Sequence, residues 1–140
     1  MQFVSRLIEF ATHHYLLVGA LLVLLILLLI HETRRSGRSL STAELTKLLN
    51  TEQGIVLDIR PKKEFATGHI VGAVNIPQDK LASSLSQLEK HKDKTLIVVD
   101  SNGQQAGAAC TPLQQAGFTT ARLTGGLSTW RGENLPLVKN

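Results

Sequence analysis

Residues 95–115 read TLIVVDSNGQQAGAACTPLQQ, and this stretch decides the fold. An apolar run, Leu96–Val99, stops at Asp100 and passes into a short polar loop. Small residues that suit a helix follow from Ala106 onward. The pattern predicts a strand, a tight loop and a helix, a junction that directs several backbone N–H groups and a helix N-terminus at one point. Such a junction favours anions and often carries a nucleophile, although its first residue here is an aspartate.

Apolar and amphipathic segments alternate on both sides of this junction. Short runs rich in β-branched residues predict buried strands, and Ser41-Thr42-Ala43-Glu44 is a capping box that begins a helix. Leucines at helical spacing predict an amphipathic helix over 78–91. Strands that alternate with helices indicate an α/β domain with a central parallel sheet flanked by helices. The expected strands are 55–60, the end of 69–77, 96–99 and 120–123, and the expected helices are 41–50, 62–67, 78–91, 106–116 and 125–130.

Composition excludes several kinds of site. The chain has 140 residues, a single cysteine and a formal net charge of +4. One cysteine excludes an intramolecular disulfide, and no Cys/His pair has the spacing of zinc ligands. The positive charge is spread thinly along the chain, which does not favour a nucleic-acid partner. We therefore expect no cofactor, no metal and no nucleic acid.

The segment that precedes the domain is apolar throughout. Residues Tyr15–Ile30 carry no charged side chain, and they end without the small-residue cleavage site of a signal peptide. They also lack the polar stripe of a helix that packs in a soluble core. With their flanking residues they approach the ~20 residues that span a bilayer. The expected divisions are a short N-terminal segment at 1–11, a transmembrane helix at 12–31, a basic linker at 32–39 and the α/β domain at 40–138.

Charges beside the apolar segment indicate its orientation. Arg34, Arg35 and Arg38 follow it, whereas Arg6 and Glu9 precede it. Positive residues stay on the cytoplasmic side, so we expect the domain in the cytoplasm and the three arginines near the lipid head groups. A linker of this length reaches only about 30 Å when extended, which keeps the domain close to the bilayer.

Three separated blocks of the domain follow the order of a known family. They are Leu57–Arg60 followed by Glu64-Phe65, Gly68–Pro77, and Leu123–Leu127 followed by Trp130 and Leu135-Pro136. In this order they resemble the rhodanese-like domain. With its apolar helix, the whole chain resembles bacterial rhodanese-like proteins anchored in the inner membrane by a single span. Four polar residues of these blocks lie near the loop: we interpret Asp58, Arg60 and Glu64 as an ion-pair network, and His69 as a hydrogen-bonded structural histidine in a turn.

The resemblance implies a specific chemistry at the loop. Active members are sulfurtransferases, in which a cysteine at the head of a Cys-x-x-Gly-x-Arg loop carries the transferred sulfur as a persulfide. The loop amides and the arginine stabilise its thiolate. In this chain the same register reads Asp100-Ser101-Asn102-Gly103-Gln104-Gln105. Asp100 has no sulfur to transfer, Gln105 is neutral, and the carboxylate is expected to accept the loop N–H groups itself.

These departures favour a domain without catalytic residues, acting as a protein-binding or regulatory module at the cytoplasmic membrane face. Its expected partners are the lipid bilayer and a membrane or cytoplasmic protein. Two alternatives stay open. One is a sulfurtransferase that uses Cys110, the single thiol, although its alanine-rich surroundings are typical of a buried residue. The other is a sensor that binds an anion in the loop without turning it over.

Overall fold

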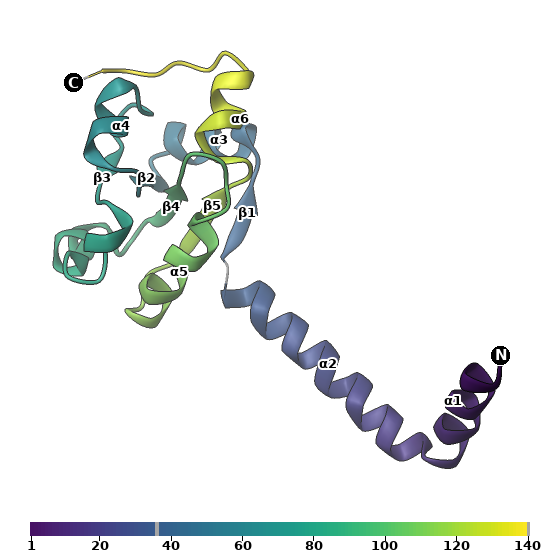
Figure 1. Ribbon diagram of the computed structural model, residues 1–140. Helices are drawn as coiled ribbons and strands as arrows, with labels where there is room; N and C mark the ends of the chain where they lie inside the picture. Colours follow the sequence, from purple (N-terminus) through teal and green to yellow (C-terminus); the bar gives the residue numbers. More distant parts are fainter. Residues whose placement is uncertain (36, 140) are drawn as a thin grey trace. The chain divides into compact units, whose positions relative to one another are not determined.

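The computed structural model describes residues 1–35 and 37–139 (Figure 1). The side chains of residues 33–35 lie outside this description, and so do the predictions that concern the side chains of Arg34 and Arg35. The chain divides into two compact units, Met1–Thr33 and a second unit that begins at Arg34. Two helices form the first unit, and the second unit contains the whole sheet.

The N-terminal unit consists of helix α1, Gln2–His13, and all but the last two residues of helix α2, Tyr15–Arg35; His14 separates the two helices. Within the described residues, α2 is the one helix long and apolar enough to cross a membrane, and none of its apolar window Tyr15–Glu32 is buried. The predicted span at 12–31 begins inside α1 and stops before α2 does. Arginine is a good helix former, so the basic residues after the apolar run continue the helix instead of ending it.

The second unit is built on a five-stranded sheet in the order β1-β5-β4-β2-β3, and every neighbouring pair is parallel. This confirms the expected α/β class with a central parallel sheet. The strands are β1 Arg38–Leu40, β2 Gly54–Asp58, β3 Val74–Asn75, β4 Thr95–Val99 and β5 Thr120–Leu123. The connecting helices are α3 Thr42–Asn50, α4 Lys62–Thr67, α5 Ala106–Gln115 and α6 Gly126–Gly132, with 3-10 helices η1 Gln78–Lys80 and η2 Leu85–His91.

Both faces of the sheet are covered, and β4 shows how. Leu96 and Val98 belong to the apolar cluster that includes residues of α5, whereas Ile97 and Val99 belong to the cluster that includes residues of α3 and α6. All four side chains are completely buried. Burying one such side chain stabilises the fold by about 1.5–3 kcal/mol. A strand covered on both faces reads as an unbroken apolar run, which is the pattern seen at the centre of the sequence.

Helix α3 begins at the predicted capping box. The Glu44 N–H donates to Ser41 Oγ at 3.2 Å, and the Ser41 N–H donates to Glu44 Oε1 at 3.4 Å. Hydrogen bonds from the Ser41 backbone and hydroxyl lower the pKa of Glu44, and Arg38 adds to the effect. Since the folded-state pKa is lowered, this contribution to stability is present above the ordinary carboxyl pKa and is lost as the pH falls through the lowered value.

The single amphipathic helix predicted over 78–91 is wrong. The segment forms two separate 3-10 helices, η1 and η2, with Ser83 and Ser84 between them. The Ser83 hydroxyl donates to the Lys80 carbonyl at 3.0 Å, a local bond that competes with helix continuation. Leu81 and Leu88 are buried nonetheless. The leucine spacing therefore identified the residues that face the core and misidentified the kind of helix.

The predicted linker at 32–39 is shorter in the structure. Helix α2 continues through Arg35, and β1 takes Arg38–Leu40 as an edge strand beside β5. Arg38 is an exposed residue of the sheet, and its guanidinium lies 3.1 Å from Glu44 Oε2. A strand of three residues offers too short a pattern to be recognised from sequence alone.

Candidate functional site

The polar loop follows β4 at the carboxyl edge of the sheet, and its first side chain points back into it. Asp100 is only 2% exposed. Its Oδ1 accepts a hydrogen bond from the Gly103 N–H at 2.7 Å. Its Oδ2 accepts from the Gln105 N–H at 2.7 Å and from the Ala106 N–H at 3.3 Å. The carboxylate therefore occupies the point at which the loop amides converge, and an anionic ligand there would have to displace it.

The backbone at the start of α6 lies close to this loop and holds it in place. Gly126 has a φ of 60°, and a Cβ on it would lie 2.5 Å from the Asp100 carbonyl oxygen. The Leu127 N–H donates to that carbonyl at 2.8 Å, and the Ser128 N–H donates to the Ser101 carbonyl at 2.9 Å. Glycine at this position lets the two backbones meet. Sequence reasoning assigned Gly126 to a motif and missed its contact with the loop.

The middle of the loop is held by its own side chains and by α4. The Ser101 hydroxyl donates to Glu64 Oε2 at 3.1 Å, and Asn102 Oδ1 accepts from the Gln104 N–H at 3.2 Å. These groups are exposed to solvent. Glu64 was predicted to belong to an ion-pair network, and in the structure its carboxylate accepts this hydrogen bond from the loop.

A hollow of about 660 Å³ lies at the end of the loop, and Gln105 lines it. Lys62 and Lys80 line the same hollow, and so does Asp79. The neutral Gln105 thus has two lysines in its neighbourhood, which sequence reasoning did not identify. Their signal in the sequence is weak: Lys62 follows β2 shortly after the Asp-x-Arg motif, at the edge where ligands of α/β sheets bind.

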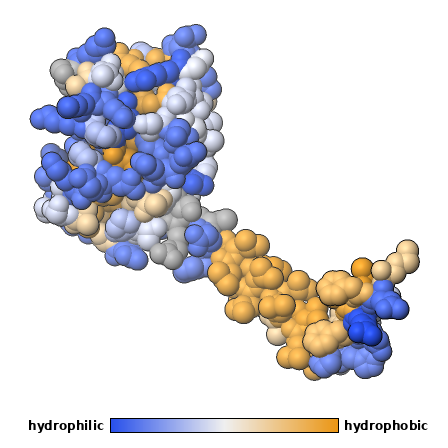
Figure 2. Space-filling model, in the orientation of Figure 1, coloured by the Kyte–Doolittle hydropathy of each residue, from blue (hydrophilic) through white to orange (hydrophobic). Residues whose placement is uncertain are grey.

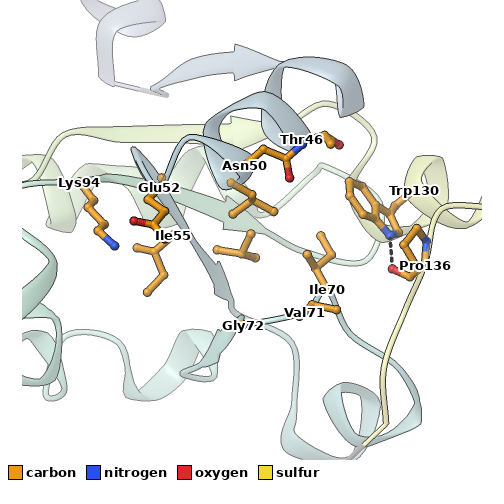
Figure 3. A pocket seen from close by; sticks show the side chains of 13 residues that line it. Thr46, Asn50, Glu52, Ile55, Ile70, Val71, Gly72, Lys94, Trp130 and Pro136 are labelled. Carbon is orange, nitrogen blue, oxygen red and sulfur yellow. Dashed lines mark hydrogen bonds between the residues drawn. The ribbon is translucent and has the colours of Figure 1, made fainter.

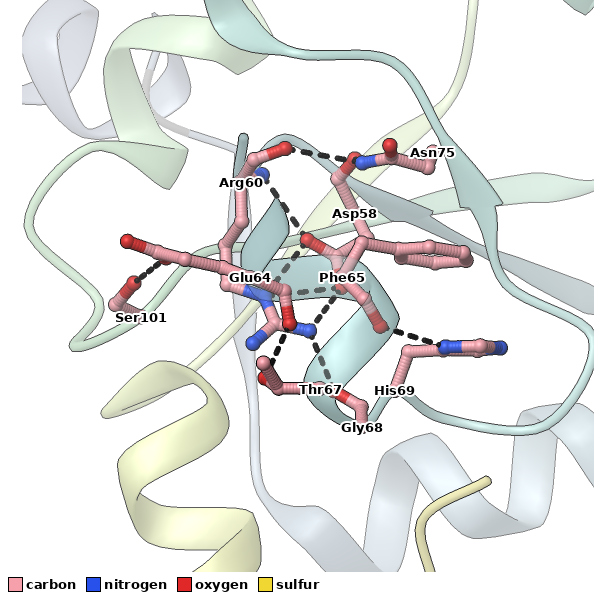
Figure 4. A network of polar contacts seen from close by, with 9 residues as sticks. All are labelled: Asp58, Arg60, Glu64, Phe65, Thr67, Gly68, His69, Asn75 and Ser101. Atoms are coloured by element: carbon pink, nitrogen blue, oxygen red, sulfur yellow. Dashed lines mark hydrogen bonds and ion pairs between the residues drawn. The ribbon is translucent and has the colours of Figure 1, made fainter. Parts of the chain in front are cut away.

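A buried ion pair stands beside the loop at the end of β2 (Figure 4). Arg60 Nε lies 3.0 and 3.1 Å from the two carboxylate oxygens of Asp58, and the Arg60 terminal nitrogen lies 2.8 Å from Oδ2. The same nitrogen donates to the Gly68 carbonyl at 2.8 Å. The Asn75 amide donates to the carbonyls of Asp58 and Arg60, both at 3.0 Å. These bonds join β2, β3 and the end of α4, so both charges serve the structure.

His69 is also held by the fold. Its Nδ1 lies 2.9 Å from the Phe65 carbonyl, and the two rings stack with centroids 3.8 Å apart. Its backbone exchanges two hydrogen bonds with Val138, at 2.9 and 2.8 Å. The side chain is 2% exposed. These contacts tie the C-terminal tail to the turn after α4, and they leave His69 apart from the loop interactions described above.

Cys110 lies inside α5 and is completely buried. Its Sγ lies 3.8 Å from the Ala121 carbonyl. Burial raises the pKa of the thiol, and the side-chain hydrogen bond with Thr120 and the charge of Arg122 oppose that effect to a smaller extent. A raised pKa leaves less thiolate at neutral pH, so the group is a poor nucleophile where it stands.

A second hollow, of about 590 Å³, lies on the face of the sheet that carries α3 and α6 (Figure 3). Ile70, Val71 and Trp130 give it apolar walls, and Glu52 and Lys94 line it as well. The Trp130 indole N–H donates to the Pro136 carbonyl at 3.0 Å. Its walls come from segments far apart in the chain, so no sequence motif marks it. Over residues 1–35 and 37–139, no three His, Cys, Asp or Glu side chains gather as a metal site requires.

Three features place the chain in a class of α/β domains in which the loop between a strand and the next helix forms an anion-binding cradle. They are the parallel sheet, the loop after β4 and the buried ion pair at the end of β2. The family described as Rhodanese-like domain matches residues 41–133, and the chain belongs to this family. YibN of Escherichia coli strain K12, described as an uncharacterized protein, is 38% identical over 143 residues, which cover 99% of this chain and 96% of YibN.

Two further relatives match a smaller share of the chain. The putative sulfurtransferase YtwF of Bacillus subtilis strain 168 is 30% identical over 100 residues, which cover 71% of this chain and 95% of YtwF. The crystal structure of a rhodanese-related protein from Thermoplasma volcanium superposes with a TM-score of 0.67 at 32% identity. It covers 74% of this chain and 99% of the solved chain.

Proposed function

We propose that this chain is a membrane-anchored rhodanese-like protein whose domain binds or regulates another protein and transfers no sulfur. The observation that carries the proposal is the Asp100 carboxylate, which accepts the N–H groups of Gly103, Gln105 and Ala106. A carboxylate supplies no sulfur nucleophile, and its charge repels a second anion from the same amides. Gln105 adds no positive charge to offset that repulsion.

The single thiol offers no replacement. Cys110 is buried within α5, and burial raises its pKa, which disfavours the thiolate that sulfur transfer requires. Its Sγ lies 3.8 Å from the Ala121 carbonyl, and the thiol also interacts with Thr120; both residues belong to β5. These contacts support a packing role and weaken the alternative of a sulfurtransferase that works through Cys110.

Anchoring is supported by α2 and by the charges around it. The helix has the length and composition of a span, and none of its apolar window is buried. Arg34, Arg35 and Arg38 follow the apolar run, against Arg6 before it, which favours a cytoplasmic domain. The similarity to YibN covers 99% of this chain, so it includes the helical unit as well as the domain.

Sulfur transfer from thiosulfate to cyanide tests the catalytic part of the proposal. The full chain in detergent is compared with Cys110→Ala and with the double variant Asp100→Cys, Gln105→Arg. We expect no thiocyanate above background from the wild type or from Cys110→Ala, and measurable turnover from the double variant, which restores a thiol and a cation to the loop. Wild-type turnover that Cys110→Ala abolishes would overturn the proposal.

Location and partnership need separate measurements. Protease added to inverted inner-membrane vesicles should digest the domain, whereas protease added to intact spheroplasts should leave it whole; the reverse pattern contradicts a cytoplasmic domain. Chemical crosslinking in intact membranes, followed by purification of the chain, should yield one adduct of constant stoichiometry. A chain that remains uncrosslinked under all conditions contradicts the role in protein binding.

A further inference from the structure

Helix α1 is amphipathic along its whole length, although its segment was expected to be a short tail. At 100° per residue, six apolar side chains fall within an arc of about 160°. They are Phe3, Val4, Leu7, Ile8, Phe10 and Ala11. The opposite arc carries the polar residues Gln2, Ser5, Arg6, Glu9, Thr12 and His13. The two sets do not mix, which is the pattern of a helix that lies at a boundary between an apolar and an aqueous phase.

The apolar face of α1 has no cover within its own unit. None of its side chains is buried, and Phe3, Leu7 and Phe10 are 76%, 53% and 58% exposed. Figure 2 shows α1 with apolar and polar surfaces side by side, whereas the apolar run of α2 is orange over its visible face. The two helices therefore fit different environments: α2 suits the hydrocarbon interior, and α1 suits its edge.

The connection to α2 identifies what covers this face. A single residue, His14, separates the two helices, and the His14 ring stacks on Phe10 with centroids 4.5 Å apart. A helix of this length extends only about 18 Å, so α1 cannot leave the vicinity of the bilayer surface when α2 spans it. Arg6 and Glu9 keep the helix out of the hydrocarbon core, where charged side chains are strongly disfavoured. The lipid surface is the apolar phase that α2 itself brings within reach of α1.

We propose that α1 lies along the lipid–water interface, on the membrane face opposite to the domain, with Phe3, Leu7 and Phe10 among the lipid chains and Glu9 toward water. This inference rests on the proposed function because it requires α2 to span the bilayer. It adds a second membrane contact to the anchor, and this contact fixes the rotation and depth of the N-terminal end of α2.

Nitroxide labels on single cysteines test this arrangement in the full chain. The background is Cys110→Ala, and the chain is reconstituted in vesicles of phosphatidylcholine and phosphatidylglycerol. Leu7→Cys and Glu9→Cys form a matched pair on opposite faces of one turn, and Leu22→Cys reports on the span. We expect the Leu7 label to be severalfold more accessible to oxygen than to a water-soluble nickel chelate, with the reverse at Glu9 and strong protection from nickel at Leu22.

The outcomes separate this inference from the anchor on which it rests. Equal accessibility at Leu7 and Glu9, with Leu22 protected from nickel, overturns the interfacial helix and leaves the span in place. A Leu7 label shielded from both oxygen and nickel means that protein, such as a second copy of the chain, covers the face, which also overturns the proposal. Nickel access at Leu22, or loss of the labelled segment by cleavage, overturns the span and the interfacial helix together.

Discussion

Two buried aspartates stand at the ends of neighbouring strands, and the fold neutralises them in different ways. Asp58 ends β2 and is paired with the guanidinium of Arg60 at 2.8 Å. Asp100 follows β4 and accepts three backbone N–H groups of its own loop. The side chains are 1% and 2% exposed. One carboxylate therefore has a full opposite charge beside it, and the other has only the dipoles of the backbone.

The difference explains why the two aspartates have different roles. Asp58 belongs to a buried ion pair that holds the structure together, whereas the charge of Asp100 keeps other anions away from the loop amides. Removing either member of the Asp58–Arg60 pair leaves an unpaired buried charge. Removing the Asp100 carboxylate leaves only neutral amides that point at an empty position, which is an arrangement that binds anions. The four substitutions that follow test this contrast, from the largest expected effect to the smallest.

Asp58→Ala is expected to lower the free energy of unfolding by about 3–5 kcal/mol, because it leaves the buried guanidinium of Arg60 without its partner. Urea unfolding of the full chain in a nonionic detergent measures the change, with the fluorescence of Trp130 as the probe. The double variant Asp58→Asn, Arg60→Met should recover part of the loss, since it removes both charges. A loss below about 1 kcal/mol for Asp58→Ala would mean that the pair is not buried as described.

Asp100→Ala is expected to cost about 2–3 kcal/mol, because it leaves the loop amides without an acceptor. The same variant should gain stability when sulfate or thiosulfate is added, seen as a rise in melting temperature, while the wild type should not respond. Asp100→Asn is the control, since its amide still fills the position. If wild type and Asp100→Ala respond equally to the anions, the carboxylate does not close the cradle.

Gly126→Ala is expected to cost at least about 1–2 kcal/mol, because a side chain disfavours its left-handed backbone. Its Cβ would also lie 2.5 Å from the Asp100 carbonyl oxygen and 2.8 Å from Asp100 Oδ1. Gly132→Ala, in the same helix with open space around it, should change stability by less than about 0.5 kcal/mol. Equal effects at the two glycines would argue against the close approach of α6 to the loop.

Glu64→Gln is expected to change stability by no more than about 0.5 kcal/mol, because its hydrogen bond to Ser101 is exposed to solvent. Ser101→Ala removes the other partner and should have an effect of the same size in urea unfolding. A loss above about 1 kcal/mol in either variant would mean that this exposed contact stabilises the fold as the two buried aspartates do. That result would contradict the proposed distinction between structural and surface charges.

The sequence predicted best the elements with strong local signals. The apolar run of β4 and the polar residues after it located the loop, helix 62–67 agrees with α4, and the capping box at Ser41 begins α3. Each of these is decided by a few adjacent residues. The acceptor role of Asp100 also followed from local reasoning, because its hydrogen-bond donors lie within six residues of it.

The features that were not predicted depend on contacts between residues far apart in the chain, or have a local sequence pattern weaker than that of a neighbouring segment. Gly126 meets Asp100 across a strand and a helix, and Arg60 reaches the Gly68 carbonyl beyond α4. Strand β1 exists because β5 offers it an edge, as in the pairing of Leu40 with Leu123. The amphipathic pattern of α1 is present in the sequence, but the long apolar run that follows it gives a much stronger signal. Propensity alone settles none of these.

Strand β1 connects helix α2 to the sheet of the domain. Only two residues separate the end of α2 at Arg35 from the first strand residue, Arg38. If α2 is anchored as proposed, tension on it loads this edge strand of the sheet, and the pairing of β1 with β5 resists that tension. A longer connection between α2 and the sheet would require β1 to detach from β5. Detachment would expose the side chain of Leu40, which is buried in the core at 2% exposure. Under the proposed anchoring, the distance between membrane and domain is thus coupled to the free energy of unfolding of the domain.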